Sequence, residues 1–91
     1  MSKVARSTVT IVNRLGLHAR PAMDFVHCAS RFDASITVRR GTQEVDGKSI
    51  MQLMLLAATC GTQLEVVAEG HDADEAIASI VELVGAGFNE D

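Results

Sequence analysis

Segments that alternate apolar and polar residues recur along the chain, and this pattern constrains the fold more than any other feature of the sequence. Side chains of a strand point alternately to its two faces, so each such segment predicts a strand with one buried face and one wet face. The predicted strands cover residues 7–13, 35–40, 43–45 and 63–69. Strands of this kind suit an antiparallel sheet that is covered on one side only.

The segments between and after these strands repeat apolar residues at the spacing of a helix. Helices are predicted over residues 19–31, 50–58 and 72–85. The expected core stripes are Ala22, Phe25, Val26 and Ala29 in the first helix and Ile77, Ile80, Val81 and Val84 in the last. Ser49 precedes the second helix as an N-cap, and Asp72 and Glu75 have the spacing of a capping box before the third.

The order of elements is therefore β-α-β-β-α-β-α, in one domain that spans residues 1–91. We predict an α+β fold of the open-faced sandwich type, in which a four-stranded antiparallel sheet is covered on one face by three helices. A chain of 91 residues has room for only one core. A buried cleft lined by many residues is not expected, so function is expected at the surface.

The composition argues against several classes of function. Twelve acidic against eight basic residues give a net charge of −4, which opposes the binding of nucleic acids. The chain has no Trp or Tyr on which bases could stack. We find no apolar run of the roughly 20 residues that a membrane span needs and no signal peptide, so we expect a cytoplasmic protein. Cys28 and Cys60 are isolated, and we expect free thiols.

The most informative stretch is the motif GLHARPA at residues 16–22. Proline lacks an N–H and is tolerated only in the first turn of a helix, so Pro21 places the helix start at about Ala19 and makes His18 the cap residue. The free amides of Ala19 and Arg20 and the positive end of the helix dipole then converge beside the imidazole ring. Such a geometry suits an anion of the size of phosphate.

This arrangement favours the transfer of a phosphoryl group to His18. A helix N-terminus disfavours the imidazolium form, so we expect a neutral ring with a lone pair available near pH 7. Phosphoryl transfer depends on positioning and charge stabilisation, which fixed amides and the Arg20 guanidinium can supply. Each such contribution is worth only about 0.3–2 kcal/mol, so the group would be held reversibly.

Plainer interpretations of the same residues remain open at this point. His18 could be an exposed polar cap with a solvated Arg20 beside it. A metal site is less well supported, because His18 and His27 lie nine residues apart and thus on roughly opposite faces of a helix. His27 and His71 are expected at the surface, and neither a metal nor another cofactor is expected. An independent enzyme would need paired carboxylates, a metal-ligand cluster or a glycine-rich phosphate loop, and the sequence offers none of these patterns.

Two motifs resemble the histidine-containing phosphocarrier (HPr) family of the phosphoenolpyruvate-dependent phosphotransferase system: GLHARPA at residues 16–22 and GKSIM at residues 47–51. The resemblance extends over about residues 4–88, with the same order of elements. It implies that Nδ1 of His18 accepts a phosphoryl group from enzyme I and donates it to EIIA domains, which makes the chain a carrier and not an enzyme. It also implies that Arg20 stabilises the phosphoryl group.

The same resemblance implies regulation at Ser49. In the family, the matching serine is phosphorylated by HPr kinase/phosphorylase, which slows the histidine relay. A phosphate at a helix N-cap meets free amides, while it adds a charge of about −1.5 to −2 to the docking face. The alternative is that Ser49 is only a cap, worth about 1 kcal/mol.

An exposed apolar patch is expected around His18, on which a donor and several acceptors would dock in turn. Its residues are Met23, Ile50, Met51 and Met54. The alternative is that Met54 and Leu55 belong to the core. Gln52 departs from the glycine often found at this position of the second motif, which leaves the packing of the second helix open.

Two features of the sequence resemble different branches of the family. The Asn13-Arg14-Leu15 lead-in and the ending over residues 87–91 resemble the nitrogen-branch paralogue NPr, whereas the GKSIM motif favours HPr proper, to which we lean. Another alternative is a regulatory module that acts through phospho-Ser49 without a relay, as in the HPr-like protein Crh. That family member lacks the active histidine, whereas this chain has His18.

Overall fold

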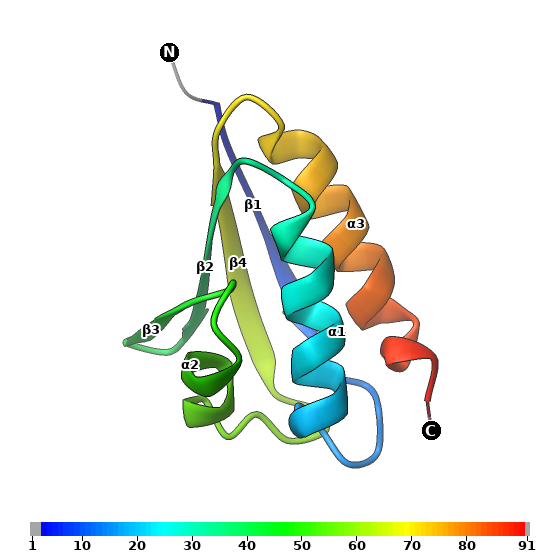
Figure 1. Cartoon of the computed structure of the whole chain (residues 1–91). Coiled ribbons are helices and arrows are strands. Elements are labelled where there is room, and N and C mark those ends of the chain that lie inside the picture. Colours follow the sequence, from blue (N-terminus) through cyan, green and yellow to red (C-terminus); the bar gives the residue numbers. More distant parts are fainter. Residues whose placement is uncertain (1–2, 91) are drawn as a thin grey trace.

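The computed structural model describes residues 3–90. Its elements are β1 (Val4–Thr10), α1 (Ala19–Ser30), β2 (Ser35–Arg40), β3 (Gln43–Asp46), α2 (Ile50–Leu55), β4 (Gln63–Glu69), α3 (Ala73–Gly85) and a 3-10 turn, η1 (Gly87–Asn89). The strands form one antiparallel sheet in the order β1-β4-β2-β3, and the helices lie on one side of it (Figure 1). The predicted open-faced sandwich is confirmed.

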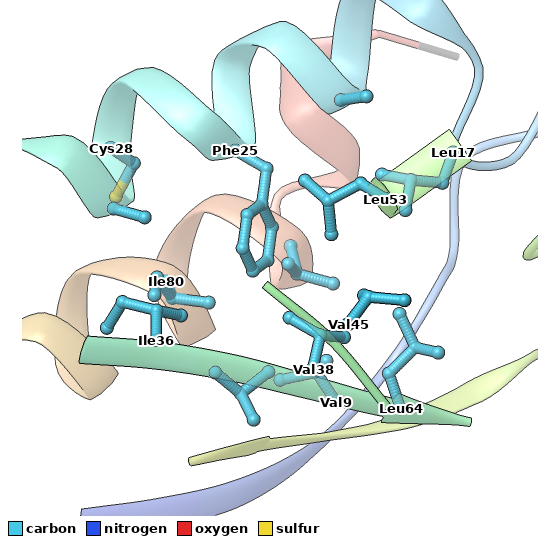
Figure 2. Packing of buried hydrophobic residues seen from close by; sticks show 14 of the residues in the cluster. Val9, Leu17, Phe25, Cys28, Ile36, Val38, Val45, Leu53, Leu64 and Ile80 are labelled. Atoms are coloured by element: carbon cyan, nitrogen blue, oxygen red, sulfur yellow. The ribbon is translucent and has the colours of Figure 1, made fainter. Parts of the chain in front are cut away.

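The core lies between the sheet and the helices (Figure 2). Inward-facing strand residues such as Val38 and Val66 are completely buried, and Phe25 points from α1 toward the sheet among them. The other face of the sheet is polar. On that face, Arg39 forms ion pairs with Glu44 on β3 and Glu65 on β4. The alternation that predicted one buried and one wet face is therefore confirmed.

The bounds of two elements differ from the prediction by more than one residue. β1 begins and ends three residues earlier, because its seven residues pair with the seven residues of β4, from Val4 opposite Glu69 to Thr10 opposite Gln63. α2 ends at Leu55 and not at residue 58, since Ala57 adopts a left-handed conformation with a φ of 49°.

Two predictions for α3 are wrong in detail. Its buried residues are Ala73, Ala76, Ile80 and Val84, whereas Val81 is 38% exposed. The alanines on the inner face let the helix lie close to the sheet. The capping box is also absent, because Asp72 makes no hydrogen bond to the first turn. Its carboxylate instead accepts the N–H groups of Asp33 and Ala34, each at 2.9 Å.

Cys28 is buried and Cys60 exposed, and both are free thiols, as predicted. None of the helices within residues 3–90 combines the length and the hydropathy that a membrane crossing requires.

Candidate functional site

His18 lies at the N-cap of α1, as predicted from Pro21. Its backbone is extended, with φ −80° and ψ −170°, and the helix begins at the next residue, Ala19. The side chain is 37% exposed. Within residues 3–90, the N–H groups of Ala19 and Arg20 have no hydrogen-bond acceptor. An accessible imidazole therefore lies at a helix end that offers free amide donors.

The loop before His18 is packed tightly against the connection between α2 and β4. The N–H of Leu17 donates to the carbonyl of Ala58 at 2.8 Å, and the Leu17 side chain is buried in the core (Figure 2). A Cβ on Gly16 would lie 2.5 Å from the same carbonyl oxygen, and Gly16 has a φ of +73°. Only glycine fits such a close approach in the left-handed region. His18 is thus held between an anchored loop and the first turn of α1.

The structure adds a carboxylate that the sequence analysis did not find. Oε1 of Glu90 lies 2.8 Å from Nε2 of His18 and 3.0 Å from Nδ2 of the buried Asn13. The hydrogen bond from His18 lowers the pKa of Glu90; partial desolvation acts against this, while Asn13 and the charges of His18 and Arg20 also lower it. The expectation of a neutral His18 ring took the helix N-terminus into account but not this carboxylate, and it stays a prediction.

A hollow of about 400 Å³ opens beside the ring, lined by Arg14, Leu15, His18, Arg20 and Glu90. Within residues 3–90, neither guanidinium group in this hollow has a hydrogen-bond or ion-pair partner. Two unpaired cations beside free amides favour the binding of a small anion. The sequence analysis named Arg14 only as part of the lead-in motif and did not predict that it lies at the site.

The predicted apolar patch lies at the surface. Its members Met23, Ile50, Met51 and Met54 are all exposed, and so is Leu55. The alternative that Met54 and Leu55 belong to the core is therefore excluded. α1 and α2, which carry these residues, pack against each other, and His18 is the N-cap of α1. The role of the patch in docking stays a prediction.

Ser49 caps α2, as predicted. Its Oγ accepts the N–H of Gln52 at 3.3 Å. The side chain of Gln52 in turn accepts the N–H of Asp46 at 2.8 Å. The glutamine that departs from the family motif therefore ties α2 to the end of β3.

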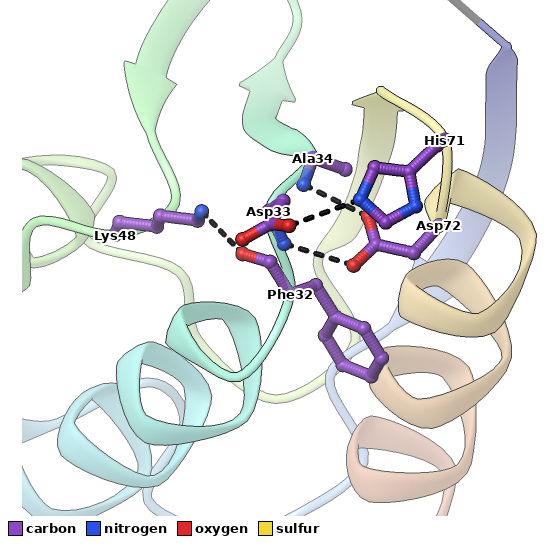
Figure 3. A network of polar contacts seen from close by, with 6 residues as sticks. All are labelled: Phe32, Asp33, Ala34, Lys48, His71 and Asp72. Carbon is purple, nitrogen blue, oxygen red and sulfur yellow. Dashed lines mark hydrogen bonds and ion pairs between the residues drawn. The ribbon is translucent and has the colours of Figure 1, made fainter.

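A second group of polar residues lies at the other end of α1 (Figure 3). Nε2 of His71 lies 3.0 Å from Oδ2 of Asp33, and this hydrogen bond raises the pKa of His71, as does the charge of Asp72. Desolvation acts to raise the pKa of Asp72, but the hydrogen bonds from the amides of Asp33 and Ala34 outweigh it and lower the pKa. The network joins the β4–α3 connection to the α1–β2 connection.

This network does not take part in the His18 site. The potential ligand atoms of Asp33, His71 and Asp72 lie within 4.8 Å of one another. However, both carboxylate oxygens of Asp72 already accept backbone amides, so we assign no metal to the cluster. His27 and His71 are both exposed, as predicted.

The chain is similar to known phosphocarrier proteins. Residues 5–86 match the family model described as "PTS HPr component phosphorylation site". Phosphocarrier protein HPr of Treponema pallidum is 48% identical over 84 residues, which are 92% of this chain and 96% of that protein. Phosphocarrier protein NPr of Escherichia coli K12 is 41% identical over 88 residues, which are 94% and 97% of the two chains.

The fold comparison agrees with the sequence comparison. The crystal structure of HPr-C-His from Thermoanaerobacter tengcongensis superposes with a TM-score of 0.92 at 41% identity, over 96% of this chain and 98% of that one. The chain therefore belongs to the HPr family of phosphocarrier proteins of the phosphotransferase system, within which its relatives carry the names HPr and NPr.

Proposed function

We propose that the chain accepts a phosphoryl group from enzyme I on Nδ1 of His18 and donates it to EIIA domains. The observation that carries the proposal is the position of the ring, which is exposed at the N-cap of α1 beside the free amides of Ala19 and Arg20. Nε2 faces Glu90, whereas Nδ1 has no hydrogen-bond partner within residues 3–90. The free nitrogen is the one with which the ring would attack.

The transfer needs only groups that this chain and its partners supply. The lone pair of Nδ1 forms the new bond to phosphorus, and the bond between phosphorus and the donor breaks, with its electron pair returning to the donor. The amides at the start of α1 and the guanidinium of Arg20 stabilise the phosphoryl oxygens. Because the hollow is open and its charges are few, the group is held weakly enough to leave again.

The partners would dock on the apolar patch of Met23, Ile50, Met51 and Met54. Exposed methionines adapt to surfaces of different shape, which suits a protein that binds a donor and several acceptors in turn. We lean to the HPr branch on the GKSIM motif, and we expect the protein to act in the cytoplasm.

The test is to incubate the protein with phosphoenolpyruvate, Mg²⁺ and enzyme I and to measure its intact mass. We expect a gain of one phosphoryl group that is lost in acid, and no gain in His18→Ala. His27→Ala is the matched control, because His27 is an exposed histidine on the same helix, and it should gain the group as the wild type does. Absence of a gain in the wild type, or an unchanged gain in His18→Ala, would refute the carrier function.

We also propose that Ser49 is a regulatory phosphorylation site. Its hydroxyl caps α2, which carries three residues of the docking patch, so a phosphate there would add negative charge where partners bind. Treatment with HPr kinase and ATP should add an acid-stable phosphoryl group to the wild type but not to Ser49→Ala, and should slow transfer from enzyme I. A Ser49→Ala variant that kept every cellular activity would eliminate the Crh-like alternative.

A further inference from the structure

Glu90 is held in place by more than its contact with His18. The same Oε1 accepts Nδ2 of Asn13 at 3.0 Å, and Nδ2 also donates to the carbonyl of Gly16 at 2.7 Å. Asn13 is 1% exposed, and its Oδ1 is buried with no hydrogen-bond partner among the described residues. Reversing the amide would set Oδ1 against two oxygen acceptors, so the two acceptors fix its orientation. A buried donor is thus aimed at Glu90.

The backbone that brings Glu90 to the ring is strained. Gly87, Phe88 and Asn89 have φ values of 64°, 56° and 59°, three left-handed residues in a row. For Phe88 this conformation is unfavourable and persists only where surrounding contacts determine it, whereas asparagine tolerates it better. Phe88 supplies one such contact, because its side chain is buried with 4% exposed, and the carboxylate supplies the other. The turn after α3 is therefore built to return Glu90 to the start of α1.

We propose that Glu90 is a positioning residue for the phosphoryl transfer, an inference that rests on the proposed function. Its carboxylate accepts the Nε2–H of His18 and so keeps the lone pair on Nδ1, the nitrogen on the opposite side of the ring. When Nδ1 forms its bond to phosphorus, Nε2 keeps its proton and the ring becomes positively charged. The carboxylate balances that charge.

The retained proton also governs the release of the group. If Nε2 is protonated, the Nδ1–phosphorus bond breaks to leave a neutral imidazole, which is a good leaving group. If Nε2 has lost its proton, the same step would leave an imidazolate anion, which is a poor one. Glu90 therefore keeps the phosphorylated ring in the form from which onward transfer and hydrolysis are fast.

The test compares Glu90→Gln, which keeps an acceptor but removes the charge, and Glu90→Ala, which removes both. Glu75→Gln is the matched control, because it removes an exposed carboxylate from the first turn of α3 that lines neither of the hollows to which Arg20 and Glu90 belong. Each protein is phosphorylated with phosphoenolpyruvate and enzyme I and freed of enzyme I. We then measure the half-life of the phosphoryl group, the rate of transfer to an EIIA domain, and the ring ¹⁵N chemical shifts of His18.

We expect both Glu90 variants to hold the group about threefold longer and to transfer it about threefold more slowly, as suits a partly exposed charge pair. Glu90→Ala should also shift the ¹⁵N resonances of the ring of unphosphorylated His18, and Glu75→Gln should match the wild type throughout. Unchanged half-lives and ring shifts in the Glu90 variants would overturn the inference, even if transfer slowed, because slower transfer alone would mean a contact with the partner. A wild type that enzyme I cannot phosphorylate would instead refute the proposed function itself.

Discussion

At the scale of single residues, the free guanidinium of Arg20 gives the sharpest test of how charge acts at the site. We expect Arg20→Ala to slow phosphorylation by enzyme I about tenfold, because it removes a charged hydrogen-bond donor from the phosphoryl oxygens. Arg20→Lys should restore part of the rate, since the charge returns without the planar fork. The measurement is the initial rate of mass gain at limiting enzyme I.

The control for Arg20 is Arg31→Ala, an exposed arginine at the other end of α1. This variant should be phosphorylated at the wild-type rate. Arg20→Ala should change the free energy of unfolding by at most about 0.5 kcal/mol, because Arg20 is exposed and interacts with Glu90 only through its charge. An Arg20→Ala protein that accepts the group as fast as the wild type would contradict the assigned role.

Local chemistry made part of the site predictable. Pro21 located the start of α1 and identified His18 as its cap, because the constraint that proline imposes on a helix concerns only the few residues around it. Glu90 could not be found in this way. It lies 72 positions from His18 in the sequence, and it reaches the ring only through a left-handed turn that Phe88 does not favour on its own.

At the scale of elements, the short helix α2 depends on side chains from the neighbouring hairpin. Nη1 of Arg40 donates to the carbonyls of Leu56 and Ala57, at 2.7 and 3.0 Å, and Gln43 donates to that of Leu55. These carbonyls at the end of a helix have no partner within it. We expect Arg40→Ala to lower the free energy of unfolding by about 1–2 kcal/mol in urea titrations.

Arg39→Ala is the matched control for Arg40. Its ion pairs lie on the open face of the sheet, where exposed pairs contribute little. The loss of stability should therefore be clearly smaller than for Arg40→Ala. Equal effects of the two variants would show that capping by Arg40 does not stabilise α2.

The order and type of the elements were predictable from the sequence, whereas boundaries that depend on contacts with other elements were not. Alternation and helical spacing are properties of each segment, and they gave the right order and type of every predicted element. The end of α2 depends on Arg40, which lies in another element, and the length of β1 depends on its partner β4. The inner face of α3 was misplaced because the small Ala73 and Ala76 carry little hydrophobic signal, although they are fully buried.

At the scale of the whole molecule, the network of Asp33, His71 and Asp72 joins two connections at the end of the sandwich away from His18 (Figures 1 and 3). The pKa of His71 is raised above its ordinary value of 6.5. A raised pKa means that the folded state binds the proton more tightly than the unfolded state. The stabilisation is therefore complete below the unfolded pKa and is lost as the pH rises through the folded one.

We accordingly expect His71→Gln to destabilise the protein more at about pH 5.5 than at about pH 8.5, as measured by urea unfolding at each pH. Asp33→Asn should reproduce the effect, because it removes the negative charge that His71 faces while it keeps an acceptor oxygen. Both variants should accept the phosphoryl group at the wild-type rate. A destabilisation that does not depend on pH would contradict the charged contact.

The most direct test of the central claim is to identify the nitrogen that carries phosphorus, by ³¹P and ¹⁵N NMR of the protein labelled in its histidine rings and phosphorylated by enzyme I. The account predicts one phosphohistidine, with phosphorus bonded to Nδ1 of His18 and the proton of the ring on Nε2. Phosphorus on Nε2 of His18, or on His27 or His71, would contradict it.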